Sequence, residues 1–264
     1  MTKPSCECAQ IRSKRNLKND YYSFHLGPFS RAAQCRPGQF LHLKLPGSDV
    51  LFRRAFSVAS IEPDRREIEV IFKVCGRGTK LMSRMHPGDP IDILGPLGNA
   101  FKLPRKSETA VMVAGGVGFP PLLNLAATMV ANGFDPSRIV FCYGGRSAGD
   151  IIERTRIRKL GIEFHPVTED GSLGEKGLVT APVRRLLEAN RGARFRLYGC
   201  GPEGMLKAVN ALGLELKTPG QISLEAPMPC GIGVCLGCVV PLTAGGHARV
   251  CCDGPVFEIG EVAL

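Results

Sequence analysis

The amino-acid sequence predicts an α+β multidomain fold with three parts in chain order. The first hundred residues contain short strands of alternating hydrophobicity, separated by turns rich in proline and glycine. Apolar strands then alternate with helical segments, a pattern typical of a parallel α/β sheet. The C-terminal segment contains a tight group of cysteines and glycines. We therefore predict domains over residues 1–103, 104–220 and 221–264, a division that a chain of 264 residues can support.

The N-terminal part is predicted to be an all-β unit, either a barrel or a sandwich, that ends near Phe101. Residues 41–45 (Leu-His-Leu-Lys-Leu) and residues 67–74 alternate in hydrophobicity, as strands do when only one face is buried. Turn signals separate the predicted strands at Pro37-Gly38, Pro46-Gly47, Pro87-Gly88 and Gly95-Pro96.

The central part is predicted to be a parallel sheet covered by helices, because buried strands and helices alternate along it. The expected strands are residues 110–114, 138–143, 162–167, 195–198 and 221–225, and the expected helices are residues 120–129, 148–159, 183–189 and 203–212. Since residues 221–225 come shortly before the cysteines, we expect the cysteine-rich segment to hang from the edge of this sheet.

The cysteines of the C-terminal segment carry the most specific signal in the chain. Three of them follow a C-x4-C-x2-C spacing and a fourth lies downstream: Cys230, Cys235, Cys238 and Cys251. This is the plant-type arrangement of thiols around a [2Fe-2S] cluster. The interleaved Gly231, Gly233 and Gly237 are expected to adopt positive φ and to turn backbone N–H groups toward the sulfur atoms.

Two other uses of these thiols have to be weighed. A structural zinc site usually pairs two short C-x2-4-C motifs, whereas here three thiols share one loop with a single distant fourth. Disulfides are not expected, because the N-terminus lacks the apolar core of a signal peptide and the number of cysteines, eleven, is odd. Cys6 and Cys8 have no further ligand nearby, so we interpret them as part of a frayed, reduced N-terminus.

Composition narrows the classes of partner. The formal net charge is +10, from 34 Lys and Arg against 24 Asp and Glu. These basic residues are scattered and match no nucleic-acid-binding motif, so we expect phosphate-bearing cofactors and an acidic protein partner rather than nucleic acid. No apolar run approaches the length that spans a membrane, and we expect a cytoplasmic protein.

Two segments of the β part can together hold a flavin nucleotide. The first is Arg54-Ala55-Phe56-Ser57, expected directly after a strand, where an arginine fork suits a pyrophosphate and the serine can reach the flavin. The second comprises Ile71-Phe72-Lys73 and then Gly78-Thr79, which is expected to lead into a short helix whose free N–H groups favour an anion. The alternatives are a strand edge with solvated arginines for the first segment and a simple turn for the second.

Two glycine-containing turns follow strands of the α/β part, where such sheets bind ligands. One contains Gly115, Gly116 and Gly118, although Pro121 stands where a dinucleotide fingerprint would have its third glycine. The other is Cys200-Gly201-Pro202, whose thiol would face a nicotinamide. For both turns, packing is the alternative role.

In chain order, the motifs R-x-F-S, G-x-G-T, A-G-G-x-G-x-x-P, Y-G-C-G-P-x-x-M and the cysteine loop resemble the ferredoxin-NADP reductase-like superfamily. Residues 223–225 and 230–257 resemble, more specifically, the electron-transfer subunits of two-protein, NAD-dependent dihydroorotate dehydrogenases. The resemblance covers essentially the whole chain. It implies an FAD-binding β-barrel, an NAD-binding α/β domain and a C-terminal [2Fe-2S] module.

The resemblance also implies roles for individual residues. It assigns FAD to Arg54 through Ser57, Ile71 through Lys73, and Gly78-Thr79, and it assigns the irons to Cys230, Cys235, Cys238 and Cys251. Its pattern R-V-C-x-D-G-P-V-F selects Cys251 as the ligand and leaves Cys252 at a variable position. It favours NAD over NADP, although Arg146-Ser147 follows a strand at a place where it could meet a 2′-phosphate.

The implied activity is that of an oxidoreductase subunit that relays electrons and has neither a catalytic residue nor a dihydroorotate site of its own. A partner subunit would oxidise dihydroorotate at FMN, in pyrimidine biosynthesis, and two catalytic and two relay subunits would form a heterotetramer. One alternative is a related reductase subunit of a hydrogenase, sulfide or ferredoxin-linked complex. Another is a zinc-stabilised nucleotide-binding module without electron transfer.

Overall fold

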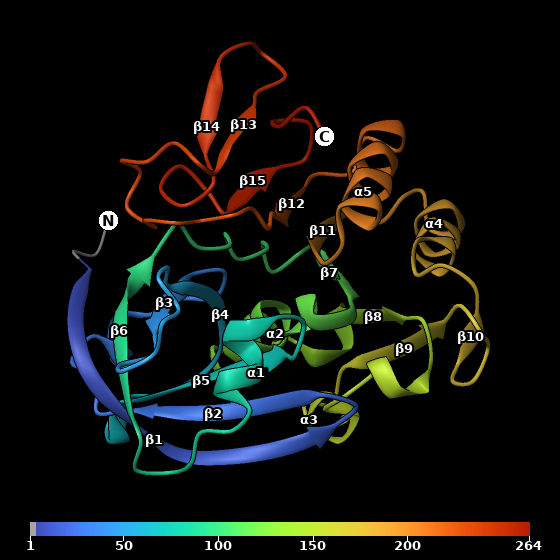
Figure 1. The fold of residues 1–264 in the computed structure, drawn as a ribbon. Coiled ribbons are helices and arrows are strands. Elements are labelled where there is room, and N and C mark those ends of the chain that lie inside the picture. Colours follow the sequence, from blue (N-terminus) through green and yellow to red (C-terminus); the bar gives the residue numbers. More distant parts are fainter. Residues whose placement is uncertain (1–3) are drawn as a thin grey trace.

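The computed structural model describes residues 4–264 and divides them into a closed barrel, a seven-stranded sheet and a small two-stranded sheet (Figure 1). The predicted fold class is therefore confirmed, and the N-terminal part is a barrel rather than a sandwich. Of the helices in residues 4–264, not one combines the length and the hydropathy needed to cross a bilayer.

The barrel closes through six antiparallel strands in the order β1-β2-β5-β4-β3-β6. Its elements are β1 (Ser5–Lys18), β2 (Tyr21–Gly27), β3 (Phe40–Lys44), β4 (Arg54–Glu62), β5 (Glu67–Lys73), α1 (Arg77–Met82) and β6 (Pro90–Leu97). Cys6 and Cys8 pair with β6 as part of β1, so the expected frayed N-terminus is wrong at these positions. Arg54 opens β4, whereas we expected it to follow a strand, because residues 45–53 form a loop between β3 and β4.

Two barrel strands are buried on both faces, which corrects the expected half-buried pattern. In β3, His42 is 0% exposed, and in β5, Glu69 is 1% exposed. The polar face of each strand meets another part of the molecule: Glu69 faces the α/β domain, and His42 faces the C-terminal segment. Alternation correctly indicated strands, but could not show that a neighbouring domain covers the polar side.

The sheet of the α/β domain has the strand order β10-β9-β8-β7-β11-β12-β15, parallel except for its last pair. Its elements are β7 (Thr109–Gly115), α2 (Phe119–Ala131), β8 (Ile139–Gly145), α3 (Arg154–Arg158), β9 (Glu163–Thr168), β10 (Glu175–Lys176), α4 (Thr180–Ala189), β11 (Phe195–Cys200), α5 (Glu203–Glu215), β12 (Gly220–Ser223) and β15 (Val256–Glu258). The helix expected over 148–159 is reduced to α3, because the buried Ile151 and Ile152 interrupt it and Glu153 adopts a left-handed φ of 54°.

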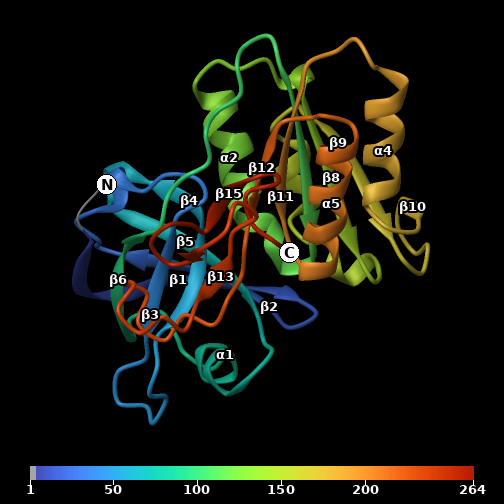
Figure 2. The same ribbon diagram turned by 90° about the horizontal axis from the view of Figure 1, so that it is seen from above.

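The C-terminal segment is attached to the sheet edge as expected, through the antiparallel pair β12 and β15. Between these strands lie the cysteine loop and the hairpin of β13 (Val239–Pro241) and β14 (His247–Arg249). Figures 1 and 2 show this segment lying over one end of the barrel and beside α5. Asn99, just after β6, binds the segment directly: its side chain accepts from the N–H of Val256 at 2.9 Å and donates to the carbonyl of Val256 at 2.8 Å.

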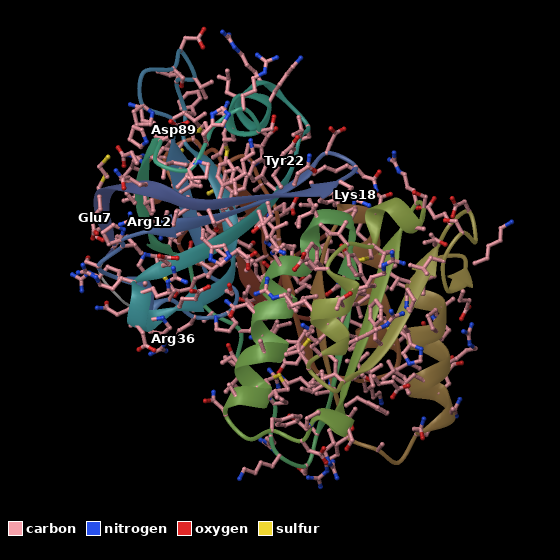
Figure 3. The ribbon with its side chains drawn as sticks, turned by 90° about the horizontal axis from the view of Figure 1, so that it is seen from below. Glu7, Arg12, Lys18, Tyr22, Arg36 and Asp89 are labelled. Atoms are coloured by element: carbon pink, nitrogen blue, oxygen red, sulfur yellow. The ribbon has the colours of Figure 1, made fainter. Side chains whose placement is uncertain are left out.

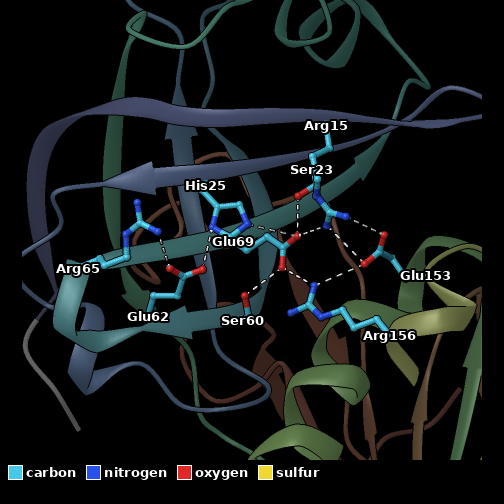
Figure 4. Close-up of polar contacts among 9 residues, drawn as sticks. All are labelled: Arg15, Ser23, His25, Ser60, Glu62, Arg65, Glu69, Glu153 and Arg156. Atoms are coloured by element: carbon cyan, nitrogen blue, oxygen red, sulfur yellow. Dashed lines mark hydrogen bonds and ion pairs between the residues drawn. The ribbon is translucent and has the colours of Figure 1, made fainter. Parts of the chain in front are cut away.

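At the opposite end, β1 extends past the barrel from Glu7 to Lys18 and reaches the α/β domain (Figure 3). Here four side chains donate hydrogen bonds to the buried Glu69 carboxylate (Figure 4). We call Glu69 and these donors the Glu69 seam: Arg15, Ser23, Ser60, Glu69 and Arg156. Arg156 of α3 donates to Glu69 at 2.5 Å, and Arg15 of β1 donates at 2.9 Å. Ser23 and Ser60 donate at 2.5 and 2.9 Å.

The charge of Glu69 is stabilised by these partners. Burial alone would raise its pKa, but the Arg156 charge and the hydrogen bond from Ser23 outweigh burial and lower the pKa to about 2. The carboxylate is therefore ionised at neutral pH, and the Glu69 seam joins the barrel to α3.

Candidate functional site

One cavity of about 430 Å³ touches all three parts of the molecule. Its walls come from β3, β4 and β5, from the loop that enters α1, from Val117 and Pro120 after β7, and from the end of β11. Residues 223–226 and Met228, which lead to the cysteine loop, line it as well. Ten of the residues predicted to bind cofactors line it: Arg54, Ala55, Phe56, Ser57, Ile71, Phe72, Lys73, Gly78, Thr79 and Cys200. The fold thus brings both predicted flavin segments and one predicted nicotinamide residue to the same space.

The two predicted flavin segments contact each other through Arg54 and Gly78. A Cβ on Gly78 would lie 2.7 Å from Nε of Arg54, so a side chain at this position would displace the guanidinium from the start of α1. Gly78 and Thr79 lie within the first turn of α1, whereas we expected them to precede the helix. The Thr79 hydroxyl accepts from the backbone N–H groups of Cys75 and Gly76 at 3.0 and 3.2 Å, and it therefore shapes the loop beside the cavity.

Lys73 lines the cavity and also binds the α/β domain. Its ammonium group donates to Asp150 of the α/β domain at 2.8 Å and lies 4.8 Å from the centre of the Tyr21 ring. The bond to Asp150 raises the pKa of Lys73. Lys73 therefore holds the two domains together at the edge of the cavity.

The two predicted dinucleotide turns reach the cavity through Val117 and Pro120 and through Cys200. Their other predicted residues do not line it: Gly115, Gly116, Gly118, Gly201 and Pro202. The turns follow the neighbouring strands β7 and β11 and pack on each other. A Cβ on Gly118 would lie 2.5 Å from the carbonyl oxygen of Cys200, and one on Gly115 would lie 2.7 Å from Pro202. Gly116 differs, because its φ is +51° and the space beside it is open.

Two titratable groups lie where the cavity approaches the cysteine loop. Burial raises the pKa of the Cys200 thiol, which therefore stays protonated. The surrounding protein also raises the pKa of Glu225, although its side chain keeps exposed surface. Glu225, predicted at the end of the last strand before the cysteines, lies in the cavity wall.

Other cavity residues had no signal in the sequence. Phe40, Leu224 and Met228 are apolar residues that pattern analysis assigns to packing, and they come to the cavity only because the three parts meet there. Arg53 lines the cavity as well, but its guanidinium is paired with Asp92 at 3.0 Å.

The four predicted ligand thiols lie in two pairs. Cys230 is within hydrogen-bond reach of Cys235, and Cys251 is within reach of Cys238. A [2Fe-2S] cluster takes four thiolates, two at each iron, and this grouping supplies them. All eleven cysteines are free, as expected.

The backbone of the loop favours the ionised thiol of Cys230. Burial opposes ionisation of Cys230, but hydrogen bonds from the N–H groups of Ile232, Val234 and Cys235 lower its pKa to about 6. Gly231 and Gly233 adopt φ of 71° and 78°, as predicted. Gly237 does not adopt a positive φ; the left-handed residue of that turn is Leu236, with φ of 58°. The paired thiols and the inward N–H groups fit an iron–sulfur cluster.

Cys252 lies close to this set. Its Sγ is 3.7 Å from Sγ of Cys251, and a Cβ on Gly233 would lie 2.7 Å from it. Cys251 is the more buried of the two adjacent cysteines.

On the barrel side, His42 packs against the loop. A Cβ on Gly231 would lie 2.7 Å from Nδ1 and from Cε1 of His42. Burial and the Arg53 charge lower the pKa of His42 to about 4. The carbonyl oxygen of His42 accepts from Arg53 at 3.4 Å, but neither ring nitrogen has a hydrogen-bond partner within residues 4–264.

Comparison with known protein families identifies a domain in each part of the chain. Residues 9–101 match an oxidoreductase FAD-binding domain, and residues 112–211 match an oxidoreductase NAD-binding domain. Residues 225–263 match the iron-sulfur cluster binding domain of dihydroorotate dehydrogenase B. The predicted FAD, NAD and [2Fe-2S] cofactors are thereby confirmed, and the zinc-stabilised alternative is wrong.

Curated relatives agree over nearly the whole length. The electron transfer subunit of dihydroorotate dehydrogenase B (NAD(+)) from Geobacillus sp. (strain WCH70) is 39% identical over 260 residues, which cover 96% of each chain. The subunit of the same name from Fusobacterium nucleatum is 36% identical over 264 residues, which cover 98% of each chain.

Solved structures share the fold. That of an NADH-dependent reduced ferredoxin-NADP oxidoreductase has a TM-score of 0.85 at 28% identity and covers 97% of this chain and 89% of its own. A ferredoxin NADP+ reductase from Neisseria gonorrhoeae has a TM-score of 0.64 at 20% identity, with 80% of this chain and 91% of its own covered. From the identity and coverage of its curated relatives, the chain belongs to the family of electron transfer subunits of NAD-dependent dihydroorotate dehydrogenase B.

Proposed function

We propose that this chain carries electrons between the FMN of a dihydroorotate-oxidising catalytic subunit and NAD⁺, in pyrimidine biosynthesis. The observation that carries the proposal is the continuity of the site. The cavity lined by Arg54 and Ser57 is also lined by residues 223–226 and Met228, and two residues later the chain reaches Cys230. When bound, the flavin exchanges a hydride with nicotinamide on one side and single electrons with the cluster on the other.

Each residue group has a defined task in this proposal. Arg54, held across Gly78, would bind the pyrophosphate of FAD, and Ser57 would contact the flavin from the same strand. The segments Ile71–Lys73 and Gly78-Thr79 would form the facing wall.

The nicotinamide nucleotide would lie over the turns after β7 and β11. Gly116 would approach it closely, while Gly115, Gly118, Gly201 and Pro202 hold the two turns together. Cys200 would lie beside the nicotinamide as a neutral thiol.

The cluster would be held by the paired thiols of Cys230, Cys235, Cys238 and Cys251. Around this loop, Ile232, Val234 and Leu236 are 50%, 72% and 61% exposed. Apolar side chains in such numbers on a short loop favour contact with another protein. We propose that the catalytic subunit docks over this loop, in a cytoplasmic heterotetramer of two catalytic and two relay subunits.

Replacement of Cys235 by serine tests the relay. Cys235→Ser should lose the iron and acid-labile sulfide, and electron transfer to the catalytic subunit should fall by at least a hundredfold. FAD should stay bound and should still be reduced by NADH. The measurements are iron, sulfide and FAD content together with anaerobic stopped-flow reduction.

Two further variants make the result specific. Arg54→Ala should show the reciprocal loss: the purified chain should contain less bound FAD but as much iron as the wild type. Cys252→Ser should keep both cofactors. Full transfer to the partner by Cys235→Ser would refute the relay. Anaerobic co-purification identifies the partner: one that lacks FMN and does not oxidise dihydroorotate would favour the ferredoxin-linked or hydrogenase-linked alternative.

A further inference from the structure

His42 is a buried polar side chain that has no part in the electron transfer proposed above. It lies in the middle of β3, paired with Ala55 of β4 on one side and Leu94 of β6 on the other. Its side chain is completely inaccessible to solvent. Burial of an imidazole is not unusual by itself, but buried polar groups in folded proteins nearly always have hydrogen-bond partners.

Neither ring nitrogen of His42 has such a partner among residues 4–264. An imidazole carries at least one N–H donor in either of its common protonation states. Leaving a buried donor unpaired costs about 1–3 kcal/mol, and a phenylalanine or leucine would avoid that cost. The chain therefore keeps at this position a donor that its own atoms do not use.

The neighbours of the ring show where a partner can come from. Phe40, which lines the cofactor cavity, lies on one side, with its ring centre 5.7 Å from that of His42. Gly231, the residue after Cys230, lies on the other side, so close that a Cβ there would be 2.7 Å from Nδ1. His42 thus lies between the wall of the cofactor cavity and the loop that carries the thiols.

We propose that His42 is a positioning residue for the iron–sulfur cluster, and that its ring N–H donates a hydrogen bond to an inorganic sulfide at the Cys230 end of the site, since no sulfur atom within residues 4–264 pairs with it. This inference rests on the proposed function, in which Cys230, Cys235, Cys238 and Cys251 hold the cluster. Gly231 is required because any side chain there would displace the imidazole. A hydrogen bond to cluster or thiolate sulfur stabilises the more negative, reduced form, so His42 raises the reduction potential of the cluster.

The direct test is the midpoint potential of the cluster in the FAD-loaded chain, measured by anaerobic redox titration with EPR detection. His42→Phe keeps a flat aromatic ring, somewhat larger than imidazole, and removes the donor, and it should shift the potential to a more negative value. His42→Asn keeps an N–H near the position of Nδ1 and should recover part of that shift. His247→Phe, in the exposed strand β14 of the same segment, is the matched control and should leave the potential unchanged.

A spectroscopic readout separates hydrogen bonding from simple packing. With ¹⁵N-labelled histidine, pulsed EPR of the reduced cluster should show a weak nitrogen coupling that His42→Phe abolishes and His247→Phe keeps. Absence of that coupling, or an unchanged potential in His42→Phe, would overturn the proposal. A strong coupling would overturn it too, because it would make His42 an iron ligand.

The outcome is distinguishable from failure of the proposed function. If the wild-type chain purifies with iron and sulfide but supports no dihydroorotate-linked transfer, the choice of partner is wrong, and the potential shift still decides the role of His42. If it purifies without a cluster, both conclusions fall. If His42→Phe loses the cluster entirely, the midpoint potential of the cluster in His42→Asn is compared with that in the wild type. A more negative potential supports the proposal, and an unchanged potential overturns it.

Discussion

Glu69 and His42 are polar side chains buried in the barrel at opposite contacts with the rest of the molecule, and they differ in whether the chain supplies their hydrogen-bond partners. Glu69, facing α3, receives hydrogen bonds from Arg15, Ser23, Ser60 and Arg156. His42, facing the cysteine loop, receives and donates none through its ring within the described residues. Both lie on strands whose alternating pattern predicted a solvent-facing polar side.

The difference separates two reasons for burying a polar group. Four donors around one carboxylate compensate its desolvation, so Glu69 contributes to the stability of the chain by itself and fixes the barrel against the α/β domain. A buried polar group without hydrogen-bond partners destabilises the isolated chain. In our proposal, the partner of His42 is supplied when the cluster binds. Removing each group should therefore affect stability in opposite directions.

The largest expected effect comes from breaking the Glu69 seam. Glu69→Ala should lower the free energy of unfolding of the FAD-loaded chain by about 3 kcal/mol, because it removes the buried carboxylate that four hydrogen bonds stabilise and leaves Arg15 and Arg156 paired with Glu153 alone. Urea denaturation, followed by circular dichroism and by flavin fluorescence, measures the change. Glu215→Ala, which removes a partner of the exposed Arg184, is the control and should leave the unfolding curve unchanged. An equally small effect of Glu69→Ala would show that the seam contributes little.

Acid should produce a comparable loss in the wild-type chain. The pKa of Glu69 is about 2 in the folded chain against an ordinary value of 4.5, so its contribution is complete above about pH 4.5 and disappears as the pH falls toward 2. The linked free energy is about 3 kcal/mol. Wild type and Glu69→Ala should converge in stability over this range, as measured by urea denaturation at successive pH values. A constant difference between them down to pH 2 would contradict the low pKa.

The smallest effect has the opposite sign. In the cluster-free chain, His42→Phe should raise the free energy of unfolding by about 1 kcal/mol, because it removes an unpaired buried donor without changing the volume much. In the cluster-loaded chain that gain should disappear. Thermal unfolding of both forms, with and without iron, measures it. Destabilisation of the cluster-free chain by His42→Phe would mean that the imidazole already has a structural role there.

Several parts of the fold and the site were predictable because their signals are local. The spacing of Cys230, Cys235 and Cys238 and the segment Arg54–Ser57 require no knowledge of distant residues. Helix α2, with prolines in its first turn, begins one residue before its predicted start. The helix predicted over 148–159 failed because burial of Ile151 and Ile152 against the sheet overrides local helical preference.

Other features depend on contacts between segments far apart in the chain. The left-handed residue between Cys235 and Cys238 is Leu236, although Gly237 next to it would accept that conformation more easily. Phe40 and Met228 line one cavity while lying nearly two hundred residues apart. Gly118 was predicted as part of a nucleotide turn, but its close approach to Cys200 became visible only when β7 and β11 were side by side.

The sequence by itself determined the fold class, the order of the three parts, the spacing of the candidate ligand thiols and the two segments proposed to meet a flavin, because spacing and periodicity are properties of neighbouring residues. Only the tertiary structure decided which polar residues are buried and whether they are satisfied. Residues 41–45 and 67–74 share one alternating pattern, yet Glu69 acquires four partners and His42 none. Burial and hydrogen bonding depend on which surfaces the domains press together, and that information is distributed over the whole chain.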